Sequence, residues 1–465
     1  MTQQEANNLV QGIYDGIFNS VTKGEAGGKP LMNASSTVLT LMKPGLAIRG
    51  KDFANPYTPG NLTGSKDAAL NTAQLVDAAP KMSSLYNESG NQISVIYKQM
   101  LDAVSIPAQP ANPALDKQIA DATAVLYRTV VVTDPDTGQQ SNKTMESQLY
   151  RDYLDNQAAY TNARQAYIAA YLAAMASTTT ANTWPLLAPT FQIPVKAAYD
   201  RWRSAGADQV EQNLAILNTS SQNGLQKAFD NAKKLYEGYG IVLDETSSGM
   251  APVTQRVSLL PSDWYSSSST ATKWTKVDIS SGNNVGSNTS DFTSYGGSAG
   301  FSMGIFSIGG SAGHSSSNQH MSNETKNLRV SFEYSLVLVR RPWLTFNLFG
   351  LKGWNVGNLM KKSTISNGAK TGQDKSLMPL LPTAFVAARN IKISANWSKS
   401  DWDLAKSATT GGGSFGIGPF SIGGSYSHSS SKETWSSAFA NGIITVPGVQ
   451  IIGVINQIVP FCPPS

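Results

Sequence analysis

Two segments in the second half of the chain alternate apolar residues with serine and glycine. The first spans Tyr295–Ser315 and turns at Gly304-Ile305, and the second spans Gly412–Ser429 and turns at Gly418-Pro419. Successive residues of a strand point to opposite faces of a sheet. Each segment therefore predicts a β-hairpin with one apolar face and one face of serine and glycine alone.

A face without bulky side chains suits the lumen of a β-barrel or the close stacking of two sheets. No Asp, Glu, Lys or Arg occurs from Ser294 to Ser317, although exposed sheet edges usually carry charge. The alternation is also the normal pattern of a hairpin in a soluble sandwich, with its apolar side inward. The candidate membrane or assembly residues on the apolar faces are Phe301, Met303, Phe306, Ile308, Phe415, Ile417, Phe420 and Ile422.

Helical periodicity dominates the first half, and we expect residues 1–245 to form a mostly α-helical domain. The clearest helix is predicted from about Lys143 to Ala176, where Tyr153, Tyr160 and Tyr167 recur at heptad spacing. That seam fits the core of a helical hairpin or bundle. Residues 31–66 contain three prolines and are expected to be loop.

After about residue 246 the composition shifts to serine, glycine and β-branched residues, which predicts a β domain over 246–465. The strings FSIGGS and HSSS occur in both hairpin segments at one constant offset, and the same offset aligns Val330–Val339 with Ile444–Gly453. We interpret this as an internal repeat covering about 274–354 and 397–465. The predicted fold class is segregated α+β: a helical bundle followed by an antiparallel β domain with a duplicated hairpin unit.

The composition is poor in charge: 14% of the 465 residues are charged, and the net charge is +5. The sequence lacks the dense basic patch that a nucleic-acid partner requires. The N-terminus lacks the apolar region of a Sec signal, and no apolar stretch is long enough for a membrane-spanning helix. We therefore expect a protein made in soluble form, exported by a non-classical route, and then extracellular or membrane-associated.

No catalytic, cofactor or metal site is predicted. Three G-x-S-x-G strings lie inside the serine-glycine pattern and lack the strand–turn–helix context of a hydrolase. His314 and His428 occupy equivalent repeat positions and are candidate pH-sensitive residues, because histidine changes charge near neutral pH. No ligand cluster of set spacing accompanies them.

Two functions fit these patterns, and an enzyme is not expected. The first is a homo-oligomeric pore-forming protein in which each subunit gives two hairpins to a shared β-barrel, with the lipid bilayer as a further partner. This resembles two-hairpin pore-forming toxins in architecture alone, since the sequence lacks their motifs. The second is a self-assembling structural protein, such as a ring, tube or particle shell, joined through the same hairpins.

Overall fold

The computed structural model has a mixed α+β fold with antiparallel sheets. It describes residues 2–22, 34–57, 64–107, 113–133, 140–174, 178–218, 222–242, 253–268, 274–281, 305–308, 317–319, 321–356, 364–371, 375–410, 414–426 and 433–463. The chain forms two compact units. The first, called the sheet unit here, comprises Met1–Asp102, Lys233–Phe349 and Leu359–Pro463, and the second, the helical unit, comprises Ala103–Ala232, Gly350–Asn358 and Pro464–Ser465.

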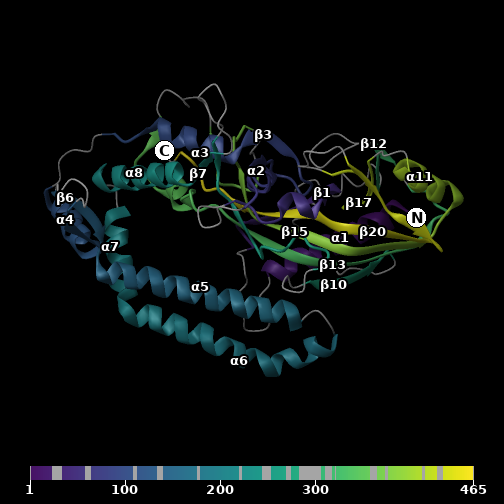
Figure 1. The fold of residues 1–465 in the computed structure, drawn as a ribbon, viewed down its shortest axis with the longest axis horizontal. Coiled ribbons are helices and arrows are strands. Elements are labelled where there is room, and N and C mark those ends of the chain that lie inside the picture. Colours follow the sequence, from purple (N-terminus) through teal and green to yellow (C-terminus); the bar gives the residue numbers. More distant parts are fainter. Residues whose placement is uncertain are drawn as a thin grey trace. The chain divides into compact units, whose positions relative to one another are not determined.

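The main sheet of the sheet unit has the strand order β1-β20-β15-β13-β10, and all neighbours are antiparallel (Figure 1). Its long central strands carry apolar and β-branched residues, which fit a pleated, buried surface. Two short strands also join it, β9 beside β13 and β19 beside β20. The bounds are β1 Thr37–Ile48, β9 Ser258–Leu260, β10 Thr275–Ser280, β13 Lys326–Arg340, β15 Leu380–Asn396, β19 Ala438–Ala440 and β20 Ile443–Ile458.

The second sheet has the order β12-β11-β16-β17-β18 and is also antiparallel. Strands stand at corresponding places in the two copies of the sequence repeat: β11 matches β17, and β13 matches β20. In the second sheet β11 and β17 lie on either side of β16, and in the main sheet β13 and β20 lie on either side of β15. Because each middle strand is antiparallel to both of its neighbours, the matching strands of the two copies run in the same direction. The bounds are β11 Phe306–Ile308, β12 Ser317–Gln319, β16 Phe415–Ile417, β17 Phe420–Ser425 and β18 Thr434–Ser436.

The copies differ where they begin. The string WTKVD from Trp274 leads into strand β10, whereas the similar string WSKSD from Trp397 leads into helix α11 (Lys399–Thr410). Ser398 Oγ caps this helix by accepting from the Asp401 backbone N–H at 3.1 Å. The Asp401 carboxylate in turn accepts from Thr325 Oγ1 at 2.5 Å, which fixes α11 to the turn before β13.

The remaining elements of the sheet unit connect these layers. α1 packs its apolar face into the core, and β7 pairs with β8, as β2 does with β3. The bounds are α1 Gln3–Thr22, η1 Gly50–Phe53, α2 Lys66–Leu75, β2 Ala78–Pro80, β3 Glu88–Gln92, α3 Ile93–Ala103, β7 Gly240–Val242, β8 Val253–Gln255 and η3 Phe346–Gly350.

The helical unit contains a long pair of helices, α5 and α6, which contact each other along their length (Figure 1). Its small core joins Leu126, Tyr153, Ala207 and Val210. The bounds are β4 Val104–Ser105, α4 Pro113–Leu126, β5 Tyr127–Thr133, β6 Gln140–Glu146, α5 Gln148–Ala174, α6 Thr178–Trp202, η2 Arg203–Ala207, α7 Asp208–Asn218, α8 Gln222–Gly238 and β14 Asn355–Val356.

The mostly α-helical domain, a helical bundle, that the sequence predicted over residues 1–245 is not confirmed. Residues 31–66, expected as loop, contain β1, which pairs with β20 in the main sheet. β1 is buried on both faces and so shows no period-2 alternation, and Pro44 lies in a bulge where the register shifts between Leu41 and Leu46. The boundary expected near residue 245 falls between β7 and β8, which pair within the sheet unit.

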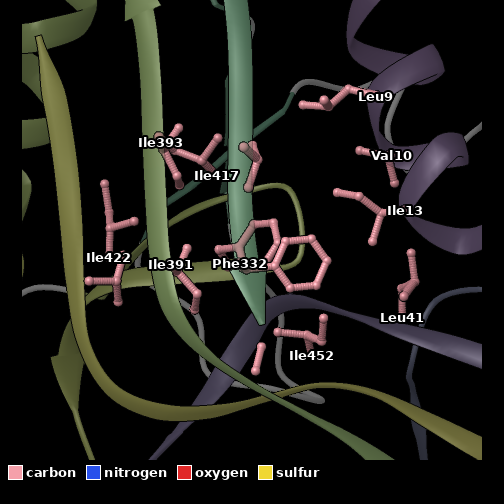
Figure 2. Close-up of a cluster of buried hydrophobic side chains, with 14 of the residues drawn as sticks. Leu9, Val10, Ile13, Leu41, Phe332, Ile391, Ile393, Ile417, Ile422 and Ile452 are labelled. Carbon is pink, nitrogen blue, oxygen red and sulfur yellow. The ribbon is translucent and has the colours of Figure 1, made fainter. Parts of the chain in front are cut away.

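The core of the sheet unit lies between α1 and the two sheets. Figure 2 shows Ile417 and Ile422 of the second sheet beside Ile391, Ile393 and Phe332 of the main sheet. One buried polar side chain also joins the sheets. Gln450 on β20 donates from Nε2 to the Ser421 carbonyl at 2.6 Å, and its Oε1 accepts from the Ser421 N–H at 2.9 Å. The side-chain amide thus takes the place of a strand backbone for β17.

We predict that Gln450→Leu lowers the free energy of unfolding by about 1–3 kcal/mol, because the buried Ser421 backbone loses both bonds. Denaturant unfolding measures the change. The matched control is Gln457→Leu on the same strand, where the side chain is half-buried, and it is expected to have a smaller effect. Equal losses in both variants would contradict a specific role for Gln450.

Lys43 gives a pH-dependent prediction. Burial lowers the pKa of its ammonium group to about 8 from about 10.5. Between about pH 8 and pH 10.5, Lys43 is protonated in the unfolded chain and mostly neutral in the folded protein. The contribution of Lys43 to the free energy of unfolding is therefore most favourable above about pH 10.5 and falls as the pH drops towards 8. We expect the difference in stability between Lys43→Met and the wild type to grow as the pH falls from 10.5 to 8. A difference in melting temperature that is constant over this range would contradict it.

Candidate functional site

The structure places most of the hairpin residues singled out from sequence inside the protein core. Phe306, Phe415, Ile417, Phe420 and Ile422 are buried, each at most 1% exposed. Ile308 is half-buried and packs against the same cluster. The other candidates, Phe301, Met303, His314 and His428, lie outside the described residues.

The serine-glycine face of the second hairpin also packs within the chain. A Cβ atom added at Gly416 would lie 2.4 Å from Pro44 Cβ of β1, and one added at Gly423 would lie 2.7 Å from Thr409 Cγ2 of α11. Both distances are far inside van der Waals contact. Glycine is therefore required here so that the backbone of the second sheet can approach β1 and α11.

The two predicted hairpins pair with each other in one chain. β11, from the first hairpin, pairs with β16 of the second, and Phe306 lies opposite Ile417. The rings of Phe306 and Phe415 lie 5.3 Å apart. The edges of β11 and β16 are therefore already hydrogen-bonded to each other, whereas a barrel shared between subunits would need free edges to pair with neighbouring chains.

We predict that Ile422→Ala lowers the unfolding free energy by about 2–5 kcal/mol, since Ile422 is fully buried in the core. A lipid-facing Ile422 would instead leave the stability of the soluble protein nearly unchanged. The control is Ile443→Ala on β20, where the side chain is 39% exposed, and its loss is expected to be below about 1 kcal/mol. Both values come from denaturant unfolding.

The tyrosine seam on α5 faces α6. Ring centroids of Tyr153 and Tyr160 each lie 5.6 Å from Trp202, and Tyr167 lies 5.7 Å from Trp184. Aromatic pairs at such distances contribute beyond the area they bury. The prediction of a helical hairpin with a tyrosine core agrees with these contacts.

Four large apolar side chains of α6 are exposed to solvent. Leu186 is 81% exposed, Ile193 65%, Leu187 48% and Phe191 42%. Leu186 and Ile193 are one heptad apart and so share a side of the helix. Phe191 instead stacks on Trp184, the residue that contacts Tyr167 of α5, with ring centroids 5.6 Å apart. We therefore call Leu186 and Ile193 alone the α6 apolar face. Large exposed apolar side chains grouped in this way are unusual and mark interaction surfaces.

The sequence around this face carries no charge. No Asp, Glu, Lys, Arg or His occurs from Gln165 to Val195, which covers the end of α5 and most of α6. Pro185, Pro189 and Pro194 lie inside α6. Each interior proline removes a backbone donor and weakens an isolated helix by roughly 3 kcal/mol. α6 therefore depends on its aromatic contacts with α5.

Other chemistry is scarce in the part of the chain that is described. Among those residues, no three His, Cys, Asp or Glu side chains gather in a way that could hold a metal ion. No helix within them is both long enough and apolar enough to span a membrane. The α6 apolar face is accordingly the candidate functional site.

Comparison with protein-family models, curated proteins and solved structures finds no match for the chain.

The α6 apolar face was missed at the level of sequence. The uncharged run from Gln165 to Val195 was the available signal, but threonine, alanine and proline dilute its hydropathy. Periodicity alone predicts a helix here and does not say which apolar residues are left uncovered by α5.

Proposed function

We propose that the protein binds lipid bilayers and that the α6 apolar face, with the uncharged end of the α5–α6 hairpin, is the part that enters the lipid. The observation that supports this most directly is the exposure of Leu186 and Ile193 within a segment without any charged residue. Apolar side chains leave water for the acyl region with a gain roughly proportional to their area.

The chemistry of the segment favours lipid over a protein partner. A protein interface usually surrounds its apolar centre with a polar and charged rim. Between Gln165 and Val195 the polar residues are only Thr, Ser, Asn, Gln and Tyr. Such residues enter the bilayer interface at low cost, whereas charged residues do not. Helix prolines are also tolerated in lipid surroundings, where neighbouring groups satisfy the freed carbonyls.

The proposal keeps a membrane role and assigns it to a different element from the one the sequence suggested. A shared barrel built from the serine-glycine hairpins stays a prediction. It would require β11, β16 and β17 to leave the core, which exposes Phe306, Phe415, Ile417, Phe420 and Ile422 and breaks both bonds of Gln450 to Ser421. Insertion of the α5–α6 hairpin requires no such rearrangement of the sheet unit.

We predict that the wild-type protein co-floats with neutral phosphatidylcholine vesicles and that the double variant Leu186→Asp, Ile193→Asp binds at least about tenfold more weakly. The matched control is Val131→Asp, a charge placed on an apolar side chain that is 58% exposed on β5, outside the α6 apolar face. It should bind like the wild type. Circular dichroism of each variant checks that the helices remain.

Because the segment is uncharged, binding should change less than about threefold between low and high salt, unlike binding through a basic surface. Equal binding by the wild type and the double variant would contradict the proposal. Self-association of the wild type without lipid, abolished by the same double variant in sedimentation velocity, would instead assign the α6 apolar face to a second copy of this chain.

A further inference from the structure

An open cavity of about 360 Å³ lies beside the end of β1, within the sheet unit. Its chemistry is unlike that of the core, because cations, hydroxyl groups and aromatic rings line it together. The lining side chains with polar groups are Arg49, Lys51, Tyr265, Ser266, Ser267 and Tyr426.

The cations of the cavity are already matched by carboxylates. Arg49 donates to both Asp52 oxygens, from Nε at 2.7 Å and from Nη2 at 2.5 Å, and its Nη1 lies 2.8 Å from Glu433 Oε1. The Lys51 ammonium lies 3.3 Å from the same Glu433 oxygen. Hydrogen bonds from Arg49 and Lys51 lower the pKa of Glu433, so that carboxyl stays ionised. The charges cancel, which disfavours an anion as the ligand.

These ion pairs also hold the polar groups in place. Arg49 is 11% exposed in its side chain, and its two carboxylate partners fix the plane of the guanidinium. On the other side of the cavity the Ser267 carbonyl accepts from Arg389 Nη1 at 2.9 Å. Arg389 is itself held by Glu333 at 2.8 Å and by the face of Trp274. A ligand would meet preorganised partners, which lowers the entropy lost on binding.

Hydroxyl groups and aromatic rings also line the cavity. Burial, with a smaller effect of Glu433, raises the pKa of Tyr426, so its hydroxyl keeps its proton and can donate or accept. Ser266 Oγ lies 3.2 Å from Ser268 Oγ. Gly448, with φ of +74°, has no atom within 4 Å of an added Cβ and leaves that wall of the cavity open. Tyr265 and Tyr426 add ring surface for apolar C–H groups.

We propose that this cavity binds a neutral carbohydrate of one or two sugar rings. Sugar hydroxyls both donate and accept, and they meet ammonium, guanidinium and hydroxyl groups in the lining without bringing a charge of their own. Their C–H faces match the tyrosine rings. A lipophilic ligand would cover the hydroxyl groups of Tyr426 and the serines without hydrogen-bonding to them, which is costly in a partly buried site.

The test measures binding of simple methyl glycosides of glucose, galactose, mannose and N-acetylglucosamine to the full chain. Saturation-transfer NMR detects binding, and calorimetry gives the dissociation constant for the best of the four. We expect at least one to bind, and Tyr426→Phe and Lys51→Ala to weaken it at least about fivefold, because each removes a hydrogen bond. Lys98→Ala is the matched control: this lysine is 57% exposed and paired with Asp102, as Lys51 is 66% exposed and paired with Glu433.

Three outcomes would overturn the proposal. One is the absence of saturation transfer from all four glycosides at millimolar concentration. Another is binding that Tyr426→Phe and Lys51→Ala leave unchanged, which would place the sugar elsewhere. The third is binding of inorganic phosphate or sulfate that is lost in Lys51→Ala, which would make the cavity an anion site. Vesicle binding is unaffected by any of these outcomes, so the two proposals fail separately.

Discussion

The close approach of the second hairpin to β1 and to helix α11, with no side chain between the backbones, is the constraint on which the sheet unit depends. Gly416 and Gly423 bring the second sheet against Pro44 and Thr409 at distances that no Cβ would allow. On the other face of the same strands, Ile417 and Ile422 fill the space above the main sheet. Gln450 then supplies the hydrogen bonds that a neighbouring strand would otherwise give. The glycines and the apolar residues of the hairpin thus have two different tasks, and the amide of Gln450 on β20 has a third.

In the second hairpin the alternation of serine and glycine with apolar residues matches β16 and β17, whereas most of the first hairpin lies outside the described residues. The alternation could not indicate what covers each face. A serine-glycine face can contact water, the lumen of a barrel or another backbone. The sequence pattern is the same in the three cases, because small residues fit in each of them. The deciding partners, Pro44 and Thr409, come from segments distant in the chain, and no local pattern reports such contacts.

The first half of the chain shows the same limit. The heptad of Tyr153, Tyr160 and Tyr167 predicted a helix and its inner face, because those contacts repeat within one element. β1 could not be predicted in this way, since a strand buried on both faces lacks alternation and its Pro44 reads as a break. The α6 apolar face is the intermediate case: its residues are visible in the sequence, but their exposure depends on how much of the helix α5 covers.

The pairing of β1 with β20 has a consequence for synthesis. Thr37 lies opposite Gln457, so β1 leaves the ribosome long before its partner strand β20. Until β20 is made, the edge of the apolar strand β1 that will pair with it stays open. Contacts between segments so far apart in sequence also form slowly. Nascent chains are therefore expected to need shielding by a chaperone between the synthesis of β1 and that of β20, and shortening the end of β20 would leave the first half of β1, Thr37–Leu41, without its partner.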